Sequence, residues 1–279
     1  MNILAYIDWN VDPVMFEFWV LDWLIEIRYY SLFFALAFGL GYGIVERMFK
    51  HENCPNNWVE SLFIYTIIAT IIGSRLGHVF FYSWDYYSQH PGEILKVWEG
   101  GLASHGGAIG ILIALFLFHK RVSFKKSYLW ILDHIVVPIA LAAFFIRMGN
   151  LMNSEIVGSP TDVPWAFRFL RLPPEEAMIP RHPSQIYEAL FYLLVFAVLV
   201  FLYQKKSFYK KEGGLFGVFL IGIFGFRIVV ETMKENQEAF EDTLMLNMGQ
   251  ILSIPFVIIG IISLAYALRD KEPNQNRRD

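Results

Sequence analysis

Residues 144–158, FFIRMGNLMNSEIVG, end a long apolar stretch with polar groups that could bind an anion. Arg147, Asn150, Asn153 and Glu155 fall within nine positions. A guanidinium binds phosphate through two parallel hydrogen bonds, and asparagine amides donate to ester or hydroxyl oxygens. Because these groups follow an apolar run, the segment predicts a site for a phosphate group carried by a lipid.

Arg227 and Glu231 form a second polar pair inside an apolar stretch, FRIVVE. Inserting an arginine near the centre of a membrane span costs roughly 2.5–3.5 kcal/mol of free energy on insertion scales. An arginine there is therefore expected to have a charged partner or a function. The pair could be an i, i+4 salt bridge that lowers its own insertion cost. Arg227 could equally face the same anion as Arg147, and the residues alone leave both interpretations open. Arg75 is a third arginine of this kind.

His105 lies in GGLASHGGAIG, between two pairs of glycines. Glycines allow another helix or a ligand to approach the backbone closely. A histidine here could pack against a neighbouring helix, or it could transfer a proton during catalysis. The glycine pairs favour the catalytic interpretation.

Several other kinds of site are excluded by the sequence. The seven histidines include no H-x-x-x-H pair, and the single cysteine, Cys54, has no cysteine partner, so a metal site and an intrachain disulfide are not expected. Neither a G-x-S-x-G nor a Walker-type loop occurs. The net charge of −3 gives no reason to expect nucleic-acid binding.

The composition is that of an integral membrane protein, since 56% of the 279 residues are hydrophobic. A helix crosses a bilayer with about 20 mainly apolar residues. Seven stretches meet that length, and the predicted class is an all-α protein with seven transmembrane helices. They are 29–48, 58–82, 100–118, 127–147, 185–204, 213–232 and 246–268.

Two regions outside the predicted spans differ from the spans in composition. Residues 1–28 mix acidic residues with Trp9, Trp19 and Trp23, which predicts a non-spanning arm at the membrane interface. Residues 148–184 contain six prolines and several aromatic residues, so they predict a structured, irregular head on the outer side. The expected organisation is the arm 1–28, a membrane domain 29–268 that includes this head, and a polar cytoplasmic tail 269–279.

Basic residues predict the orientation, because Lys and Arg accumulate in cytoplasmic loops. Fourteen of them follow the first, third, fifth and seventh spans. The loops 83–99 and 233–245 on the opposite side carry seven acidic residues. The N-terminus is therefore expected outside and the C-terminus in the cytoplasm.

Nine motifs in order resemble those of the prolipoprotein diacylglyceryl transferases of the bacterial cytoplasmic membrane, and together they extend over nearly the whole chain. They are DPVMF at 12–16, IRYYSL at 27–32, GSRLGHVFFY at 73–82, GGLASHGG at 100–107, RMGNLMNSEIVG at 147–158, DVPWAFRF at 162–169, RHPSQIYEAL at 181–190, FRIVVE at 226–231 and MGQILSIP at 248–255.

The resemblance implies transfer of the diacylglyceryl group of phosphatidylglycerol to the lipobox cysteine of a preprolipoprotein. A thioether forms and glycerol 1-phosphate leaves, and neither a metal nor an organic cofactor is expected. The implied partners are phosphatidylglycerol, preprolipoprotein signal peptides and the bilayer. Carried onto this sequence, the catalytic set is Tyr30, His105, Arg147, Glu155 and Arg227. The phosphatidylglycerol-binding set is Arg147, Asn150, Asn153, Gly158, Arg227 and Glu231.

Two departures from the usual family pattern are Ser104 before the histidine and the form NLMNSE. Neither replaces a polar catalytic position, but Ser104 leaves open whether a hydroxyl shares the task of His105. Two functions of other classes are a secondary transporter and a seven-span receptor for a small anionic or lipid ligand. A transporter is disfavoured because the chain shows neither an inverted repeat nor paired broken helices.

Overall fold

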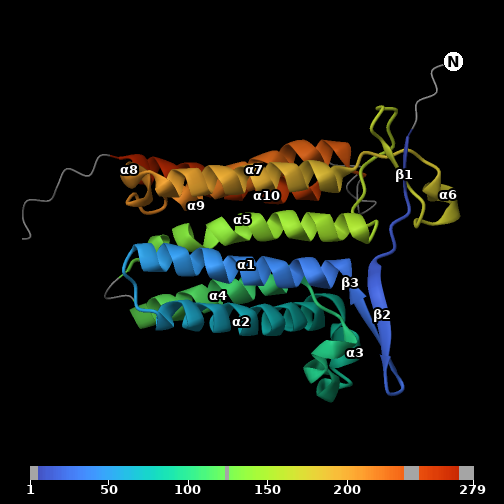
Figure 1. Cartoon of the computed structure of the whole chain (residues 1–279), viewed down its shortest axis with the longest axis horizontal. Coiled ribbons are helices and arrows are strands. Elements are labelled where there is room, and N and C mark those ends of the chain that lie inside the picture. The colour runs from blue at the N-terminus through green and yellow to red at the C-terminus, as the bar shows by residue number, and fades with distance from the viewer. Residues whose placement is uncertain (1–5, 123–125, 236–244, 270–279) are drawn as a thin grey trace, which may run out of the picture. The chain divides into compact units, whose positions relative to one another are not determined.

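The computed structural model describes residues 6–122, 126–235 and 245–269. Most of the predicted tail 269–279 and of the loop 233–245 lies outside these residues. Within the described ranges, seven helices are long and apolar enough to cross a membrane, which confirms the predicted number of spans (Figure 1). They are α1 (Tyr29–His51), α2 (Asn57–Tyr82), α4 (Ser104–Val122), α5 (Tyr128–Met152), α7 (Ser184–Gln204), α9 (Gly214–Val230) and α10 (Met248–Leu268).

Shorter elements lie between the spanning helices. The connection from α2 to α4 holds α3 (Trp84–Tyr87) and the 3-10 turns η1 (Pro91–Leu95) and η2 (Val97–Glu99). The helices α6 (Pro174–Ala177) and α8 (Lys206–Tyr209) flank α7, and η3 (Glu231–Met233) continues from the end of α9. The strands are β1 (Ile7–Trp9), β2 (Val14–Val20), β3 (Trp23–Arg28) and β4 (Phe167–Phe169).

The chain divides into two compact units, one of Tyr42–His134 and one of Met1–Gly41 with Ile135–Asp279. In the unit Tyr42–His134, α2 and α4 lie side by side because glycines replace side chains at their contact. A Cβ atom on Gly106 would lie 2.2 Å from the carbonyl oxygen of Gly73, and one on Gly110 would lie 2.3 Å from that of Ala69. Only glycine permits such backbone contact.

In the larger unit, α9 lies beside α7 and α10 (Figure 1). A Cβ atom on Gly217 of α9 would lie 2.7 Å from the carbonyl oxygen of Gly260 on α10. This contact too requires a glycine, because any side chain would separate the two helices.

The N-terminal arm contains strands that the sequence analysis did not identify. β1 pairs in parallel with β4 of the head segment, and the indole nitrogen of Trp9 donates to the carbonyl oxygen of Leu151 at 3.0 Å. Leu151, Phe167 and Phe169 form a buried cluster on which Trp9 packs. β1 and Trp9 therefore attach the N-terminal arm to the head segment. The hairpin of β2 and β3 leaves Trp19 and Trp23 69% and 77% exposed.

Four predicted span boundaries were wrong by three to five residues, namely the ends of the first, third and fourth spans and the start of the third. The fourth span was predicted to end at Arg147, but α5 runs to Met152. Gly149 within this last part of α5 lies against the ring of Tyr30, whose Cδ2 would lie 2.6 Å from an added Cβ. The third span was predicted to begin at Gly100. It begins at Ser104, since Gly100 and Gly101 have φ angles of 87° and 67° that a right-handed helix excludes.

Candidate active site

The last turns of α5 bring three of the predicted site residues together. A guanidinium nitrogen of Arg147, Nη1, donates to Oδ1 of Asn150 at 3.1 Å, one helical turn further on. The chain then turns through Ser154 and Ile156, which have φ angles of 54° and 56°. This turn brings Glu155 back to α5, where its Oε1 accepts a hydrogen bond from Nδ2 of Asn150 at 2.7 Å.

Asn153 joins the same carboxylate from the turn. Its Nδ2 donates to Oε1 of Glu155 at 3.3 Å, whereas its Oδ1 is buried without a hydrogen-bond partner among the described residues. An acceptor oxygen of this kind can serve a ligand hydroxyl. Gln185, at the start of α7, holds the turn from the other side, donating from Nε2 to the carbonyl oxygen of Glu155 at 2.8 Å.

Glu188 of α7 is the fully buried carboxylate of the site. Its Oε2 lies 3.0 Å from Nε of Arg147 and 3.2 Å from Nζ of Lys234, and its Oε1 accepts a hydrogen bond from the hydroxyl of Tyr192 at 3.0 Å. The exposure of the Glu188 side chain is 0%, so its ionised form depends on these partners.

The end of α9 extends the network to the second predicted arginine. Nζ of Lys234 lies 3.1 Å from Oε1 of Glu231, and Nε of Arg227 lies 3.5 Å from the same oxygen. The Arg227 side chain is 39% exposed, whereas those of Arg147 and Lys234 are 14% and 5% exposed. Of these three cations, Arg227 is the one that an incoming anion reaches most easily.

Neighbouring residues fix Glu231 in this network. Nδ2 of Asn247 donates to the backbone carbonyl oxygen of Glu231 at 3.3 Å. A Cβ atom on Gly249, at the start of α10, would lie 2.6 Å from Cδ of Glu231. The interpretation of Arg227 and Glu231 as an i, i+4 salt bridge is thus partly right, because the two residues do form an ion pair. Glu231 also binds Lys234, however, so the pair belongs to a larger network.

Gly158 is surrounded by atoms of its own chain. Its amide donates to the carbonyl oxygen of His182 at 3.0 Å, and its backbone bridges that of Lys234. An added Cβ would lie 2.6 Å from His182 and 2.8 Å from the carbonyl oxygen of Met233. Burial lowers the pKa of His182 below its usual 6.5, so this imidazole is neutral near pH 7. Gly158 is thus packed tightly against the backbone of Met233 and Lys234.

Tyr30 and His105 complete the predicted set. The Tyr30 ring packs on Gly149 of α5, one residue before Asn150. His105 lies in the first turn of α4 with an exposed side chain, in the unit Tyr42–His134. The other eight predicted residues belong to the larger unit. A shared site for His105 and Arg147 stays a prediction. The side chain of Ser104 is not among those described.

The sequence analysis gave neither Glu188 nor Lys234 an individual role in the site. Glu188 stands in the motif RHPSQIYEAL, and a carboxylate inside a predicted span is itself a signal that it has a partner. Lys234 follows Glu231 by three residues, the spacing of neighbours on one helix face.

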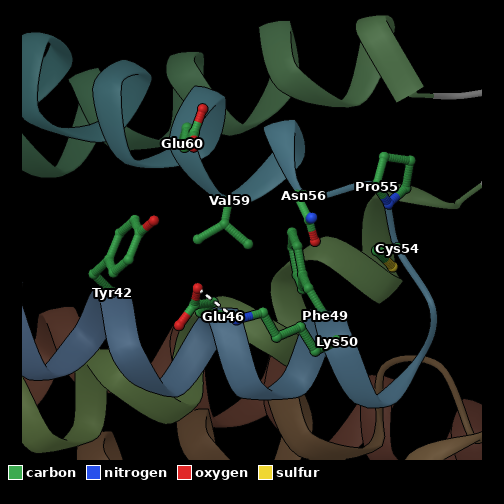
Figure 2. Close-up of a pocket in the computed structure, with 9 residues that line it drawn as sticks. All are labelled: Tyr42, Glu46, Phe49, Lys50, Cys54, Pro55, Asn56, Val59 and Glu60. Carbon is green, nitrogen blue, oxygen red and sulfur yellow. Dashed lines mark hydrogen bonds and ion pairs between the residues drawn. The ribbon is translucent and has the colours of Figure 1, made fainter.

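A cavity of about 180 Å³ lies between the end of α1 and the start of α2. Figure 2 shows the ion pair of Glu46 and Lys50, 2.8 Å long, at its edge, with Cys54 nearby. None of the predicted site residues lines this cavity. Among the described residues, no group of three His, Cys, Asp or Glu side chains could hold a metal ion.

Comparison with known proteins gives a consistent result. A family model described as prolipoprotein diacylglyceryl transferase matches residues 14–266. A phosphatidylglycerol–prolipoprotein diacylglyceryl transferase of Porphyromonas gingivalis is 46% identical, with 97% of this chain and 98% of the relative aligned. Relatives of the same name from Chloroherpeton thalassium and Tolumonas auensis are 44% and 40% identical. These alignments cover 98% and 94% of this chain, and 98% of each relative.

Proposed function

The chain belongs to the prolipoprotein diacylglyceryl transferase family, and from that premise we propose how it carries out the transfer. It moves the diacylglyceryl group of phosphatidylglycerol to the thiol of a lipobox cysteine, the first step of lipoprotein lipidation. The new carbon–sulfur bond forms as the bond from the same carbon to the phosphate oxygen breaks. Glycerol 1-phosphate leaves with the electron pair of that bond, and the thiol proton must be accepted.

The network of Arg147, Glu188, Lys234, Glu231 and Arg227 is the observation that supports a phosphate site. Its three cations outnumber its two carboxylates. Fixed positive charge in a site that excludes water stabilises negative charge that grows on a leaving group. Arg227 is the most exposed of the three cations, and its Nε lies 3.5 Å from Oε1 of Glu231, so we assign it the first contact with the phosphate.

Arg147 has a different task, because Glu188 and Asn150 already occupy its Nε and Nη1. The guanidinium is held in one orientation, and an N–H group that these contacts leave unused can meet a phosphate oxygen. Bidentate binding, which the sequence suggested, would require one of the two existing contacts to break. We propose that Arg147 keeps its protein contacts and contributes charge and one donor.

The remaining residues surround the headgroup in this proposal. Asn150 and Glu155 form a hydrogen-bonded pair beside Tyr30, and the unpartnered Oδ1 of Asn153 can accept a glycerol hydroxyl. Glu231 keeps Arg227 and Lys234 in place, and Gly158 acts through Lys234. His105 accepts the proton of the incoming thiol or orients that thiol.

The protein is a multi-pass membrane protein with seven apolar helices, and we propose that its N-terminus faces out and its C-terminus the cytoplasm. The basic residues after alternate spans support this orientation. The arm then lies at the outer interface. The exposed Trp19 and Trp23 of its hairpin support that position, because tryptophan favours the headgroup level.

One experiment separates the transferase from a transporter or receptor. The purified full-length protein is incubated with phosphatidylglycerol vesicles and a lipobox peptide, and the peptide mass is measured. A transferase adds one diacylglyceryl group and releases glycerol 1-phosphate in equal amount. Ligand uptake or binding without a change in peptide mass would contradict the proposal. A peptide with serine in place of the lipobox cysteine is the matched control.

The pH profile of His105→Gln tests the role of His105. A free thiol has a pKa of about 8.5 and is only a few per cent ionised near neutrality. If His105 accepts the thiol proton, the variant loses transfer at neutral pH and recovers part of it as the pH approaches about 8.5, where solvent supplies the thiolate. A loss that is equal at every pH and follows a fall in thermal stability would instead indicate a packing role.

A further inference from the structure

Arg75 of α2 is buried, with 3% of its surface exposed, and its donors end on backbone carbonyl oxygens. Nε donates to Ile94 at 2.9 Å, and Nη2 donates to Glu93 at 2.6 Å. Nη1 donates to Gly100 at 2.6 Å and to Gly101 at 3.4 Å. A buried guanidinium committed in this way is not available to an anion, which separates Arg75 from Arg147 and Arg227.

The four carbonyl groups belong to one segment of chain, the connection between α3 and α4. Gly100 and Gly101 adopt positive φ angles, and in that conformation both their carbonyl groups face Nη1 of Arg75. An added Cβ on Gly101 would lie 2.9 Å from this nitrogen and 2.7 Å from the ring of His78. The segment therefore fits closely around the guanidinium.

The same contacts lead directly to His105. The amide of Ala103 donates to the carbonyl oxygen of Ser74, the residue before Arg75, at 2.9 Å. On the other side of His105, Gly106 lies against the backbone of Gly73 and Gly77. The chain on both sides of His105 is thus fixed by one stretch of α2, and Arg75 holds the N-terminal side.

We propose that Arg75 is a positioning residue for His105, and this inference rests on the proposed catalytic role of His105. The guanidinium sets the conformation of Gly100 and Gly101, and these residues set where α4 begins and where the imidazole stands. Lysine cannot replace it, because one ammonium group lacks the planar arrangement of donors that reaches carbonyl groups on three sides. The proposal explains why the membrane domain retains a costly buried arginine here.

A double-mutant cycle tests the proposal by measuring kcat and KM for the lipobox peptide. Arg75→Lys should lower kcat about tenfold or more, since small displacements of a catalytic group are costly, and should leave KM nearly unchanged. In a His105→Gln background the same substitution should have almost no further effect on kcat. Independent, multiplicative losses would overturn the proposal. So would a fully active His105→Gln enzyme, because no coupling could then exist.

Two glycine variants, one a test and one its control, leave the Arg75 side chain itself unchanged. Gly101→Ala places a methyl group against Arg75 and His78 at a residue with positive φ, so it should reproduce the loss of Arg75→Lys and the absence of a further effect with His105→Gln. Gly92→Ala lies in the same connection, where an added Cβ meets no atom within 4 Å, and should behave like the wild type. This pair decides the question if Arg75→Lys fails to insert.

Amide hydrogen exchange provides a readout that does not depend on turnover. In Arg75→Lys or Gly101→Ala, the amide of Ala103 and those of residues 94–102 should exchange faster, while amides within α2 keep their protection. Unchanged exchange at these residues would mean that Arg75 does not hold the segment, and the inference would fail. A wild-type protein that produced no diacylated peptide would instead contradict the proposed function, whatever the exchange result.

Discussion

Arg147 is restrained by the protein before any substrate arrives. Its contacts with Glu188 and Asn150 hold the guanidinium plane, and the full burial of Glu188 makes that restraint strong. A buried carboxylate that loses one partner becomes unfavourable, although Lys234 still contacts Glu188 in this site. Arg147 is therefore both a structural and an electrostatic residue, and substitutions must separate the two roles.

Arg147→Lys should keep the positive charge but reach only one of its two partners. We expect transfer by Arg147→Ala to fall about 10²-fold or more, the usual effect of removing one donor that stabilises a transition state. Lysine should restore only a small part of that activity, measured as kcat with the lipobox peptide. The control is Arg168→Lys, whose side chain pairs with Asp8 outside the site. Near-normal turnover by Arg147→Lys would contradict the assigned role.

At the scale of elements, Glu52 in the connection between α1 and α2 contacts residues at and just before the start of α5. Its Oε1 lies 2.6 Å from Nε2 of His134, and its Oε2 accepts hydrogen bonds from Lys126 at 3.0 Å and Trp130 at 2.7 Å. Burial by itself would raise the pKa of Glu52. The hydrogen bond and charge of His134, with the other two donors, lower that pKa from 4.5 to about 2.

The depressed pKa of Glu52 predicts how stability depends on pH. A carboxyl group that is more acidic in the folded state stabilises it above its unfolded pKa. This stabilisation should therefore be complete above about pH 4.5 and be lost as the pH falls toward about 2. Thermal unfolding in nanodiscs should show a falling Tm across this range. Glu52→Gln should lower the Tm at pH 7 and flatten its decline.

Glu46→Gln is the matched control for Glu52→Gln. Glu46 also pairs with a lysine, at 2.8 Å, but both side chains are exposed, and exposed pairs contribute little to stability. The Tm of the Glu46→Gln variant should equal that of the wild type at every pH. Equal effects of the two substitutions would mean that the network around Glu52 is no stronger than a surface ion pair.

At the scale of the whole molecule, the seven helices alternate in direction through the bilayer if each one spans it. The charge pattern then requires every connection after an odd-numbered span to face the cytoplasm. A reporter fused after Lys211 should be cytoplasmic. One fused near Glu238, outside the described residues, should be exported. The reverse result at either fusion would show that the assigned orientation is wrong.

The sequence by itself determined the membrane class, the number of spans and most of the polar residues near Arg147. These features depend on local properties, namely the length of apolar runs and the cost of a charge within them. The predicted span boundaries were less accurate, and glycines stand near two of those that failed. Gly149 sits inside a helix, whereas Gly100 and Gly101 end one, and glycine identity does not distinguish these two uses.

Only the tertiary structure decided which charges meet. Arg147, Glu188, Lys234 and Glu231 come from segments far apart in the chain, and their contacts join the end of α5, the start of α7 and the chain just after α9. Likewise, the pairing of β1 with β4 joins the arm to the head. Pairing partners depend on packing between elements rather than on local pattern. For that reason the sequence could place Arg75, Arg147 and Arg227 in spans and suggest the local pair of Arg227 with Glu231, but it could not assign the distant partners of Arg75 and Arg147.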